Sequence, residues 1–570
     1  METDYQHAVY DYVRSPDQDA AVPVRRPVAV VGAGPVGLST AIDLARQGVP
    51  VVLLDDDCSL SVGSRAICFA KRTLEIFDRL GCGDAIADKG VSWNLGKVFF
   101  RDQPVYEFNL LPESGHRRPA FINLQQYYVE GYLLDHALRL PGIDIRWKNR
   151  VSGVTQDEKG ATLIVDTPDG PYRLQCDYVV AADGARSPVR AFCGLESRGQ
   201  TFRDRFLIAD VKMTAEFPPE RWFWFDPPFH PNQSVLLHRQ PDKVWRIDFQ
   251  LGWDADPVEE KKPENVIPRI RALLGDKAEF TLEWVSVYTF SCLRMERFRH
   301  GRVLFAGDCA HGVSPFGARG ANSGVQDADN LAWKLKLVIE GKAPDALLDS
   351  YCDERQYAAD ENIRHSTRAT DFITPKSDVS RCFRDVVLRL AKRHDFARRL
   401  VNSGRLSLPA TLEGSVLNTP DRDAFAGAMV PGAPLADAPV RTDGHEQWLV
   451  SLVGDRFAGL YFSGPDPISP ERIEAMQSLA QHDIPVEVML VVPPGHTALR
   501  AQGIRVIEDM QGLAGERFDA QPGSFYLIRP DQHVCARWRE FDAALVQRAV
   551  LRATGNLFDT SMEARPSCAA

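Results

Sequence analysis

Three glycines near the start of the chain have the spacing of a loop that binds the pyrophosphate of a dinucleotide. Residues 28–37 read Val-Ala-Val-Val-Gly-Ala-Gly-Pro-Val-Gly, so an apolar strand leads directly into a G-x-G-x-x-G turn. Gly32 permits a tight turn, Gly34 lets the backbone approach a phosphate, and Gly37 lets the next helix pack closely on the strand. Asp55 stands eighteen residues beyond Gly37, where a carboxylate can accept hydrogen bonds from a ribose. The pattern predicts a dinucleotide site.

The elements around these residues form a strand–helix–strand unit. Residues 41–48 are typical of a helix and residues 51–54 of a second strand, so the N-terminus of the helix faces the phosphates. Between residues 197 and 286 the pattern changes to alternating and aromatic runs, which predict an antiparallel sheet. The α/β pattern returns at residues 302–306 and continues into long helices.

The composition narrows the class of protein. A chain of 570 residues is too long for one hydrophobic core, so two to four domains are expected. A net charge of −10 disfavours a nucleic-acid surface, and the eleven cysteines include no C-x-x-C pair, which favours a reducing compartment over disulfides or a zinc site. Residues 1–26 lack the apolar core of a signal peptide, and no eighteen-residue window is continuously apolar. We expect a cytoplasmic protein with no nucleic-acid, metal or membrane partner.

Two further motifs resemble those of a known enzyme family. Asp183-Gly184 ends one apolar strand, and Gly307-Asp308 follows another. Together with the glycine turn, in this order and spacing, they resemble the single-component, FAD-dependent aromatic hydroxylases (class A flavoprotein monooxygenases). The resemblance extends over residues 27 to about 555. The size and three-part layout are similar to the subgroup of 3-(3-hydroxyphenyl)propionate hydroxylase and phenol hydroxylase.

This resemblance implies an FAD site and assigns residues to it. Arg65 matches an arginine near the FAD phosphates, Gln125 a glutamine that contacts the FAD chain, and Asp308 an aspartate that binds a ribityl hydroxyl. The loop 317–322 matches a segment whose backbone N–H groups point at the pyrimidine edge of the flavin, where they stabilise negative charge. The cofactor-binding residues implied in this way are Gly32, Gly34, Pro35, Val36, Gly37, Asp55, Arg65, Gln125, Asp183, Gly184, Asp308, Pro315, Gly320, Ala321 and Asn322.

The resemblance also implies a reaction. NADH or NADPH docks transiently and reduces FAD, O2 adds at flavin C4a, and the hydroperoxide transfers one oxygen atom to an electron-rich phenolic ring, as in aromatic catabolism. The protein contributes a dry cavity and a base or hydrogen-bond partner for the phenol. The expected ligands are therefore FAD, NADH or NADPH, O2 and a small phenolic substrate. A homodimer is expected by resemblance alone.

Substrate-contacting residues are expected on the strand at residues 244–251. Arg246, Asp248 and Gln250 alternate with apolar residues and therefore share one face of the strand. Arg246 matches a family arginine that contacts the flavin ring, and Asp248 and His238 occupy positions where relatives place substrate contacts. A solvated strand face would show the same alternation. The catalytic candidates are Arg246, Asp248 and His238, and no metal ligand is expected.

The expected fold is α/β: a Rossmann-like FAD-binding domain, an inserted antiparallel-sheet substrate domain and a C-terminal thioredoxin-like α/β domain. The last domain lacks the C-x-x-C that a redox role requires. Residues 1–26 are expected to form an N-terminal extension, and residues 406–424, rich in Pro, Gly and Ala, a linker. The expected ranges are 27–196 with 287–405 for FAD binding, 91–111 with 197–286 for substrate binding, and 425–558 for the thioredoxin-like domain.

Alternative functions remain open from the sequence. The enzyme could hydroxylate a bulkier, polyketide-type aromatic, or it could be a flavin-dependent reductase or dehydrogenase that inserts no oxygen. A non-catalytic flavoprotein is a further alternative. Trp222–Pro227 nearly matches the W-x-W-x-I-P motif of flavin-dependent halogenases, with Asp226 in the Ile position. An aromatic strand that packs the substrate domain is the simpler interpretation of that segment.

Overall fold

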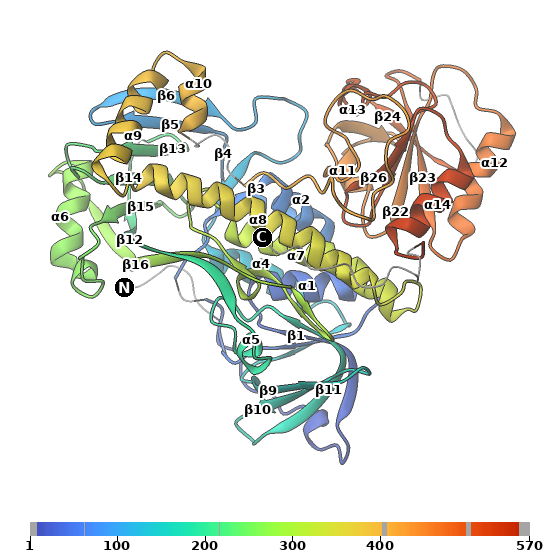
Figure 1. The fold of residues 1–570 in the computed structure, drawn as a ribbon, viewed down its shortest axis with the longest axis horizontal. Helices are drawn as coiled ribbons and strands as arrows, with labels where there is room; N and C mark the ends of the chain where they lie inside the picture. Colours follow the sequence, from blue (N-terminus) through green and yellow to red (C-terminus); the bar gives the residue numbers. More distant parts are fainter. Residues whose placement is uncertain (1–7, 62, 216, 402–406, 497–502, 558–570) are drawn as a thin grey trace. The chain divides into compact units, whose positions relative to one another are not determined.

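The chain folds into two compact units whose boundary falls inside two long helices, α7 (Gly320–Ile339) and α8 (Leu347–Ile373) (Figure 1). The computed structural model describes residues 8–61, 63–215, 217–401, 407–496 and 503–557. Unit 1 comprises the residues up to 114, 118–329 and 356–409. Unit 2 comprises residues 115–117, 330–355 and those from 410 onward.

The first sheet of unit 1 carries the glycine turn. β1 (Val24–Val31) lies between β11 (Tyr172–Ala181) and β2 (Val51–Leu54) and runs parallel to both. Its apolar residues are almost completely buried, as expected for a parallel strand covered on both faces. The Rossmann-like arrangement is thereby confirmed. The order is β17 (Arg299–His300), β18 (Val303–Phe305), β11, β1, β2 and β8 (Ile143–Arg146), with β10 (Ala161–Asp166) and β9 (Arg150–Gln156) added antiparallel beside β11.

The helix after the glycine turn, α1, runs from Pro35 to Arg46 and so begins earlier than the expected residue 41. Proline is favoured at the first position of a helix, because the N–H that it lacks would have no partner within the helix. α1 contacts α4 (Gln126–Ala137) and α2 (Lys71–Leu80). The short helices α3 (Gly83–Lys89) and α5 (Pro188–Phe192) complete this part of unit 1.

Residues 8–23 pack against the edge of the parallel sheet. The buried carboxylate of Asp17 pairs with Arg26 at 2.6 Å and with Arg146 of β8 at 2.5 Å. The ring of Tyr10 stacks on Trp147, with 4.8 Å between the ring centroids. Ion pairs and aromatic stacking therefore hold residues 10–17 against the sheet before β1 begins.

The second sheet of unit 1 is the expected antiparallel sheet, which is also confirmed; among its described strands, only the pair formed by residues 221–225 and 96–100 runs parallel. Its longest strands, β12 (Ser197–Met213) and β16 (Phe280–Met295), pair along most of their length. Trp245, Ile247 and Phe249 of β15 (Val244–Leu251) pack on α6 (Pro263–Leu274), so the residues between them face the other side of the sheet. The order is β19 (His311–Gly312), β16, β12, β15, β14 (Ser234–Arg239), β13 (Arg221–Phe225), β5 (Leu95–Phe100) and β6 (Gln103–Asn109).

Helices and a small sheet complete unit 1. An aromatic core joins the antiparallel sheet to α8, α9 (Asp378–Ala391) and α10 (Asp395–Leu400). β3 (Cys68–Ala70), β7 (Phe121–Asn123) and β4 (Val91–Trp93) form a separate three-stranded sheet. Short 3-10 helices lie at Pro16–Gln18, Glu259–Lys261, Gly307–Cys309 and, in unit 2, Leu479–Gln481.

Unit 2 has three layers around one mixed sheet (Figure 1). Side chains on one face pack with α11 (Leu449–Leu452) and α13 (Leu513–Arg517), and those on the other face pack with α12 (Pro470–Ser478) and α14 (Ala543–Ala553). The thioredoxin-like assignment of this part of the chain stays a prediction. The strand order is β21 (His445–Trp448), β20 (Pro439–Thr442), β24 (Arg505–Asp509), β23 (Val486–Val492), β22 (Phe457–Phe462), β25 (Phe525–Ile528) and β26 (Val534–Trp538).

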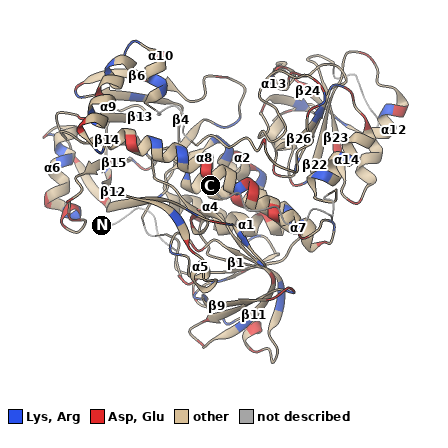
Figure 2. Cartoon of the chain, viewed as in Figure 1, with Lys and Arg blue, Asp and Glu red and all other residues tan. Residues whose placement is uncertain are grey.

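Charged residues of both signs are interspersed along the elements of both units, as Figure 2 shows. Among the described residues, no helix is long and apolar enough to cross a membrane. Within the same ranges, no group of three or more His, Cys, Asp or Glu side chains is arranged to hold a metal ion.

A buried network of charges lies inside unit 2. Arg529 pairs with Glu354 at 2.6 Å and with Asp531 at 2.5 Å, and Lys334 pairs with Glu354 at 2.7 Å. All four side chains are almost fully buried, and burial lowers the pKa of Lys334 to about 8. Each charge is tolerated only because an opposite charge lies beside it.

We predict that Arg529→Met lowers the free energy of unfolding of unit 2 by about 3–5 kcal/mol, because the buried carboxylates of Glu354 and Asp531 each lose an ion pair with Arg529, and Lys334 remains to pair with Glu354. Chemical denaturation followed by tryptophan fluorescence measures the change. The matched control is Lys336→Met, which removes a partly exposed ion pair with Glu340 and should cost less than about 1 kcal/mol. Equal effects of the two substitutions would contradict the prediction.

Candidate functional site

The glycine turn after β1 is tight on one side and open on the other. Gly32 has a φ of +104°, and a Cβ at this position would lie 2.5 Å from the carbonyl oxygen of Ala182. A Cβ at Gly37 would lie 1.8 Å from the carbonyl oxygen of Gly32, so α1 can approach the turn only because Gly37 has no side chain. A Cβ at Gly34 meets nothing within 4 Å, and Gly34 lines a cavity. The backbone there is accessible to a ligand.

Asp55 ties the end of β2 to the same turn. One carboxylate oxygen accepts the N–H of Ala33 at 2.5 Å, and the other accepts the N–H of Asp57 at 2.9 Å. Burial raises the pKa of Asp55, while the hydrogen bond from Ala33 opposes that rise. Asp55 is not among the residues that line the cavity, and its role as a ribose acceptor stays a prediction.

The Gly-Asp motif is held from behind by α7. Asp327 accepts the N–H of Gly307 at 2.9 Å, and the same oxygen lies 2.6 Å from Nε2 of His311. This support fixes the 3-10 turn on which Asp308 stands. The side chain of Asp308 lies deep in the unit but is open to the cavity, and burial raises its pKa. His311 therefore acts on the motif through Asp327.

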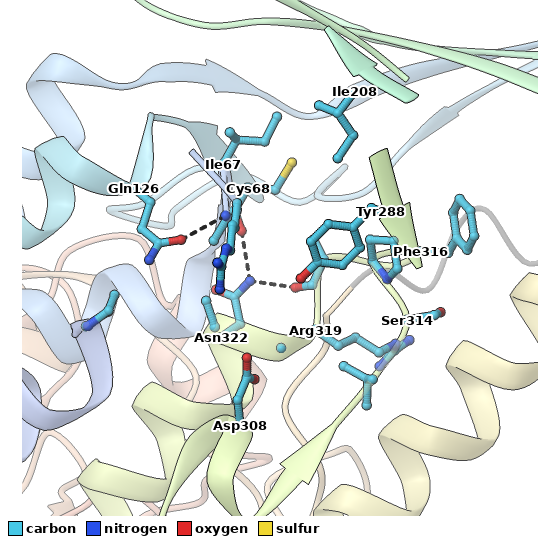
Figure 3. Close-up of a pocket in the computed structure, with 18 of the residues that line it drawn as sticks. Ile67, Cys68, Gln126, Ile208, Tyr288, Asp308, Ser314, Phe316, Arg319 and Asn322 are labelled. Carbon is cyan, nitrogen blue, oxygen red and sulfur yellow. Dashed lines mark hydrogen bonds between the residues drawn. The ribbon is translucent and has the colours of Figure 1, made fainter. Parts of the chain in front are cut away.

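The loop that leads into α7 is fixed by its own side chains. Asn322 accepts the N–H of Ala70 at 2.8 Å. It also donates to the carbonyl oxygens of Cys68 at 2.9 Å and Ala318 at 2.6 Å (Figure 3). The buried guanidinium of Arg319 donates to Asn362 at 2.9 Å. The side chain of Asn322 thus shapes the loop that lines the cavity.

The antiparallel sheet contributes the other wall. Arg246 binds Asp210 through Nε at 2.8 Å and Nη2 at 2.7 Å, and it also donates to the backbone carbonyls of Ser64 and Arg65. This arginine therefore joins the sheet to the loop that carries Arg65. Asp248, two residues farther along β15, faces the cavity, and its Oδ1 has no hydrogen-bond partner.

The pKa values of Asp248 and His238 on this wall both differ from their ordinary values. Burial raises the pKa of Asp248 to about 6, against the opposing charge of Arg246. Burial and the positive charges of Arg221 and Arg246 hold the pKa of His238 well below its ordinary value. At neutral pH Asp248 is a carboxylate and His238 is an uncharged imidazole, with Nδ1 unpartnered.

These two walls enclose one cavity of about 340 Å³. Figure 3 shows Asp308 at its lower end, Ile208 of the antiparallel sheet at its upper end, and Tyr288 between them. The predicted residues that line it are Gly34, Pro35, Val36, Arg65, Gly184, Asp308, Pro315, Gly320, Ala321, Asn322, His238, Arg246 and Asp248. The predicted residues outside its lining are Gly32, Gly37, Asp55, Gln125 and Asp183.

Comparison with known proteins identifies the family. A family model described as an FAD binding domain matches residues 25–366. The 3-(3-hydroxy-phenyl)propionate/3-hydroxycinnamic acid hydroxylase of Paraburkholderia xenovorans is 31% identical over 89% of this chain and 88% of that protein. The chain belongs to the FAD-dependent aromatic hydroxylases. It is a flavoprotein monooxygenase, as its motifs predicted.

Other relatives agree with this assignment. A hydroxylase of the same name from Mycolicibacterium smegmatis is 27% identical to this hydroxylase over 92% of the chain and 91% of the relative. A solved structure of the flavin-dependent monooxygenase PieE with FAD and substrate superposes with a TM-score of 0.79 at 24% identity, covering 94% of this chain and 100% of that chain. The shared fold extends over both units.

The residues present fit FAD. Open space lies above Gly34 at the N-terminus of α1, where a pyrophosphate meets free N–H groups. Both side-chain amide atoms of Gln125 are buried without a partner, as is Oδ1 of Asp183. Neither residue lines the cavity, so the fit to FAD rests on the open turn at Gly34 and on the lining residues. Arg65, Asp308 and the backbone of residues 315–321 would hold the rest of the cofactor.

Sequence reasoning missed several lining residues of the hydroxylase. Arg221 begins the aromatic strand β13, one residue before the segment Trp222–Pro227 that the sequence pattern assigns to packing. Arg221 is two residues from Phe223 and four from Phe225, so all three side chains lie on the same face of the strand. Phe223 and Phe225 belong to the hydrophobic core on the cavity side of the sheet, and this spacing could have placed Arg221 there too. Cys68 and Tyr288 also line the cavity, and burial raises the pKa of both.

We predict that alanine substitutions at Gly34 and Gly37 affect different properties, FAD affinity in the first case and stability in the second. Gly34→Ala should leave the thermal unfolding temperature of the FAD-free hydroxylase unchanged, because its φ of −75° suits alanine and no atom is displaced. It should weaken FAD binding about tenfold or more, because the methyl group occupies the path of the pyrophosphate.

Gly37→Ala should instead lower the unfolding temperature of the FAD-free protein, because its Cβ collides with the Gly32 carbonyl. Fluorescence titration with FAD and differential scanning fluorimetry measure the two quantities. A Gly34→Ala protein with native FAD affinity would contradict the assignment of this turn.

Proposed function

We propose that this hydroxylase uses NADH or NADPH and O2 to hydroxylate a small phenolic ring in aromatic catabolism. The observation that carries the proposal is a single cavity lined both by the cofactor motifs and by polar and aromatic residues of the antiparallel sheet. The names of relatives at 27–31% identity, hydroxylases of 3-(3-hydroxyphenyl)propionate, support a phenolic substrate.

Bound FAD supplies the transfer of electrons from NADH or NADPH and of one oxygen atom from O2. The chain supplies the surroundings. Ile208, Leu236 and Phe316 give the cavity apolar walls that exclude water. Asp248 accepts a hydrogen bond from the phenol at its unpartnered Oδ1, which holds the hydroxyl and increases electron density on the ring. The uncharged His238 offers a second acceptor beside it.

The first test is oxidation of NADH and NADPH by the FAD-loaded enzyme across phenols, hydroxybenzoates and hydroxyphenylpropionates, with peroxide and products measured together. We expect at least one phenol to stimulate oxidation, with a product one oxygen atom heavier and little peroxide. If no phenol stimulates oxidation, or if peroxide accounts for all of it, the proposed function is wrong.

A second prediction concerns pH. Below the pKa of about 6 Asp248 is protonated, and above it the carboxylate accepts the phenol hydrogen, so kcat/KM should rise as the pH increases through about 6. Asp248→Asn should lower kcat/KM about a hundredfold and remove this rise. The control is Asp254→Asn, at an exposed position after β15, which should keep the wild-type profile. A rise that persists in Asp248→Asn would assign the titration to another group.

A further inference from the structure

A row of four polar side chains crosses the antiparallel sheet on the cavity side. Arg246 lies opposite Asp210 on β12 and opposite His238 on β14. Trp222 lies opposite Leu237, so Arg221, one residue earlier on β13, comes next to His238. Residues directly opposite each other in an antiparallel sheet project from the same face. The row is therefore Arg221, His238, Arg246 and Asp210.

The two arginines of this row differ in their partners. Arg246 is bound by Asp210 through two hydrogen bonds. Arg221 makes no hydrogen bond or ion pair with any residue that the structure describes, although only 8% of it is exposed. Burial lowers its pKa, and electrostatic interactions with Cys68 and Asp248 oppose that shift. A buried guanidinium stays charged and costs several kcal/mol unless an anion satisfies it.

The surroundings of Arg221 define the shape of such an anion. Arg221 lines the cavity together with aromatic and aliphatic side chains of the same sheet, among them Phe206, Ile208 and Leu236. Figure 3 places Ile208 at the end of the cavity away from Asp308. These apolar side chains suit an aromatic ring, and the guanidinium suits an anionic substituent on that ring. A carboxylate matches the fork of an arginine with two parallel hydrogen bonds.

We infer that Arg221 binds a carboxylate of the aromatic substrate, so that the hydroxylase prefers phenols with an acidic side chain over neutral phenols. The inference rests on the proposed function and narrows its substrate class. Asp248 then holds the hydroxyl end of the same molecule and Arg221 the acid end, which orients the ring in the cavity. The neutral His238 lies between the two arginines and adds no third charge.

The test is ligand binding to the FAD-loaded enzyme without NADH or NADPH, followed by the change in flavin absorbance. The ligands are 3-(3-hydroxyphenyl)propionate and its uncharged amide, which has nearly the same shape. The wild type should bind the acid about tenfold or more tightly than the amide, which corresponds to about 1.4 kcal/mol or more. Arg221→Met should lose this preference while the affinity for the amide stays unchanged, and Arg221→Lys should retain part of it.

Two controls separate a binding role from a structural one. Arg271→Met, at an exposed position on α6 across the same sheet, should keep the preference for the acid. Arg221→Met should not lower the unfolding temperature, because the substitution breaks no hydrogen bond or ion pair with a described residue and removes a buried charge; a structural arginine would lower it. A wild type that binds the amide as tightly as the acid, or an Arg221→Met enzyme that still prefers the acid, overturns the inference.

Turnover distinguishes this inference from the proposed function. Hydroxylation of neutral phenols with no preference for acids would leave the function standing and overturn the role of Arg221. Preference for the acid in binding, with no hydroxylated product from any phenol, would leave the carboxylate site standing and overturn the function.

Discussion

The buried pair of Arg246 and Asp210 is the interaction on which the site depends. It neutralises a charge in the middle of the antiparallel sheet, and the remaining N–H groups of Arg246 bind the backbone of the loop at residues 64–65. This side chain thus ties the antiparallel sheet to the loop that carries Arg65, which lines the cavity. Breaking such a pair would leave a buried charge uncompensated, which is far more costly than losing a surface ion pair.

The same pair sets the electrostatics of its neighbours. Because Asp210 is used by Arg246, no carboxylate of the row remains for Arg221. His238 lies beside both guanidinium groups and is kept uncharged. Asp248 feels the positive charge of Arg246 but remains buried enough for its pKa to rise to about 6. With Arg246 and Asp210 paired to each other, the same wall of the cavity presents the uncharged imidazole of His238, the carboxylate of Asp248 and the guanidinium of Arg221.

Much of the architecture could be predicted from local sequence because local constraints determine it. Gly32 and Gly37 admit no side chain without a collision, so the turn is readable from residue type alone. The alternation of polar and apolar residues in β15 similarly predicts that Arg246 and Asp248 share one face of the strand. The partners of Arg246 could not be read in this way, because Asp210 and the loop at 64–65 meet it only after the sheet pairs.

The same reason explains why the cavity position of Arg221 was not predicted. Which residues lie beside an arginine at the start of an aromatic strand depends on the strands that pair with it. The early start of α1 was missed for a simpler reason, since the glycine turn was taken to extend over residues that already belong to the helix. The position of Arg221 depends on strand pairing between distant segments, and the first residue of a helix is poorly determined by local sequence, so neither follows from neighbouring residues alone.

The position of the unit boundary inside α7 and α8 has a consequence for how this chain can be divided. Residues 330–355 supply Trp333, Leu337 and Leu347 to the hydrophobic core of unit 2. A chain cut before residue 410 would keep these helices but lose the sheet that covers their apolar side chains, and exposed surfaces of that kind promote aggregation. The C-terminal part is therefore not a removable module. It shares its hydrophobic core with residues 330–355, which come earlier in the chain. A single cut in the sequence therefore cannot separate unit 2 from unit 1 without dividing a hydrophobic core.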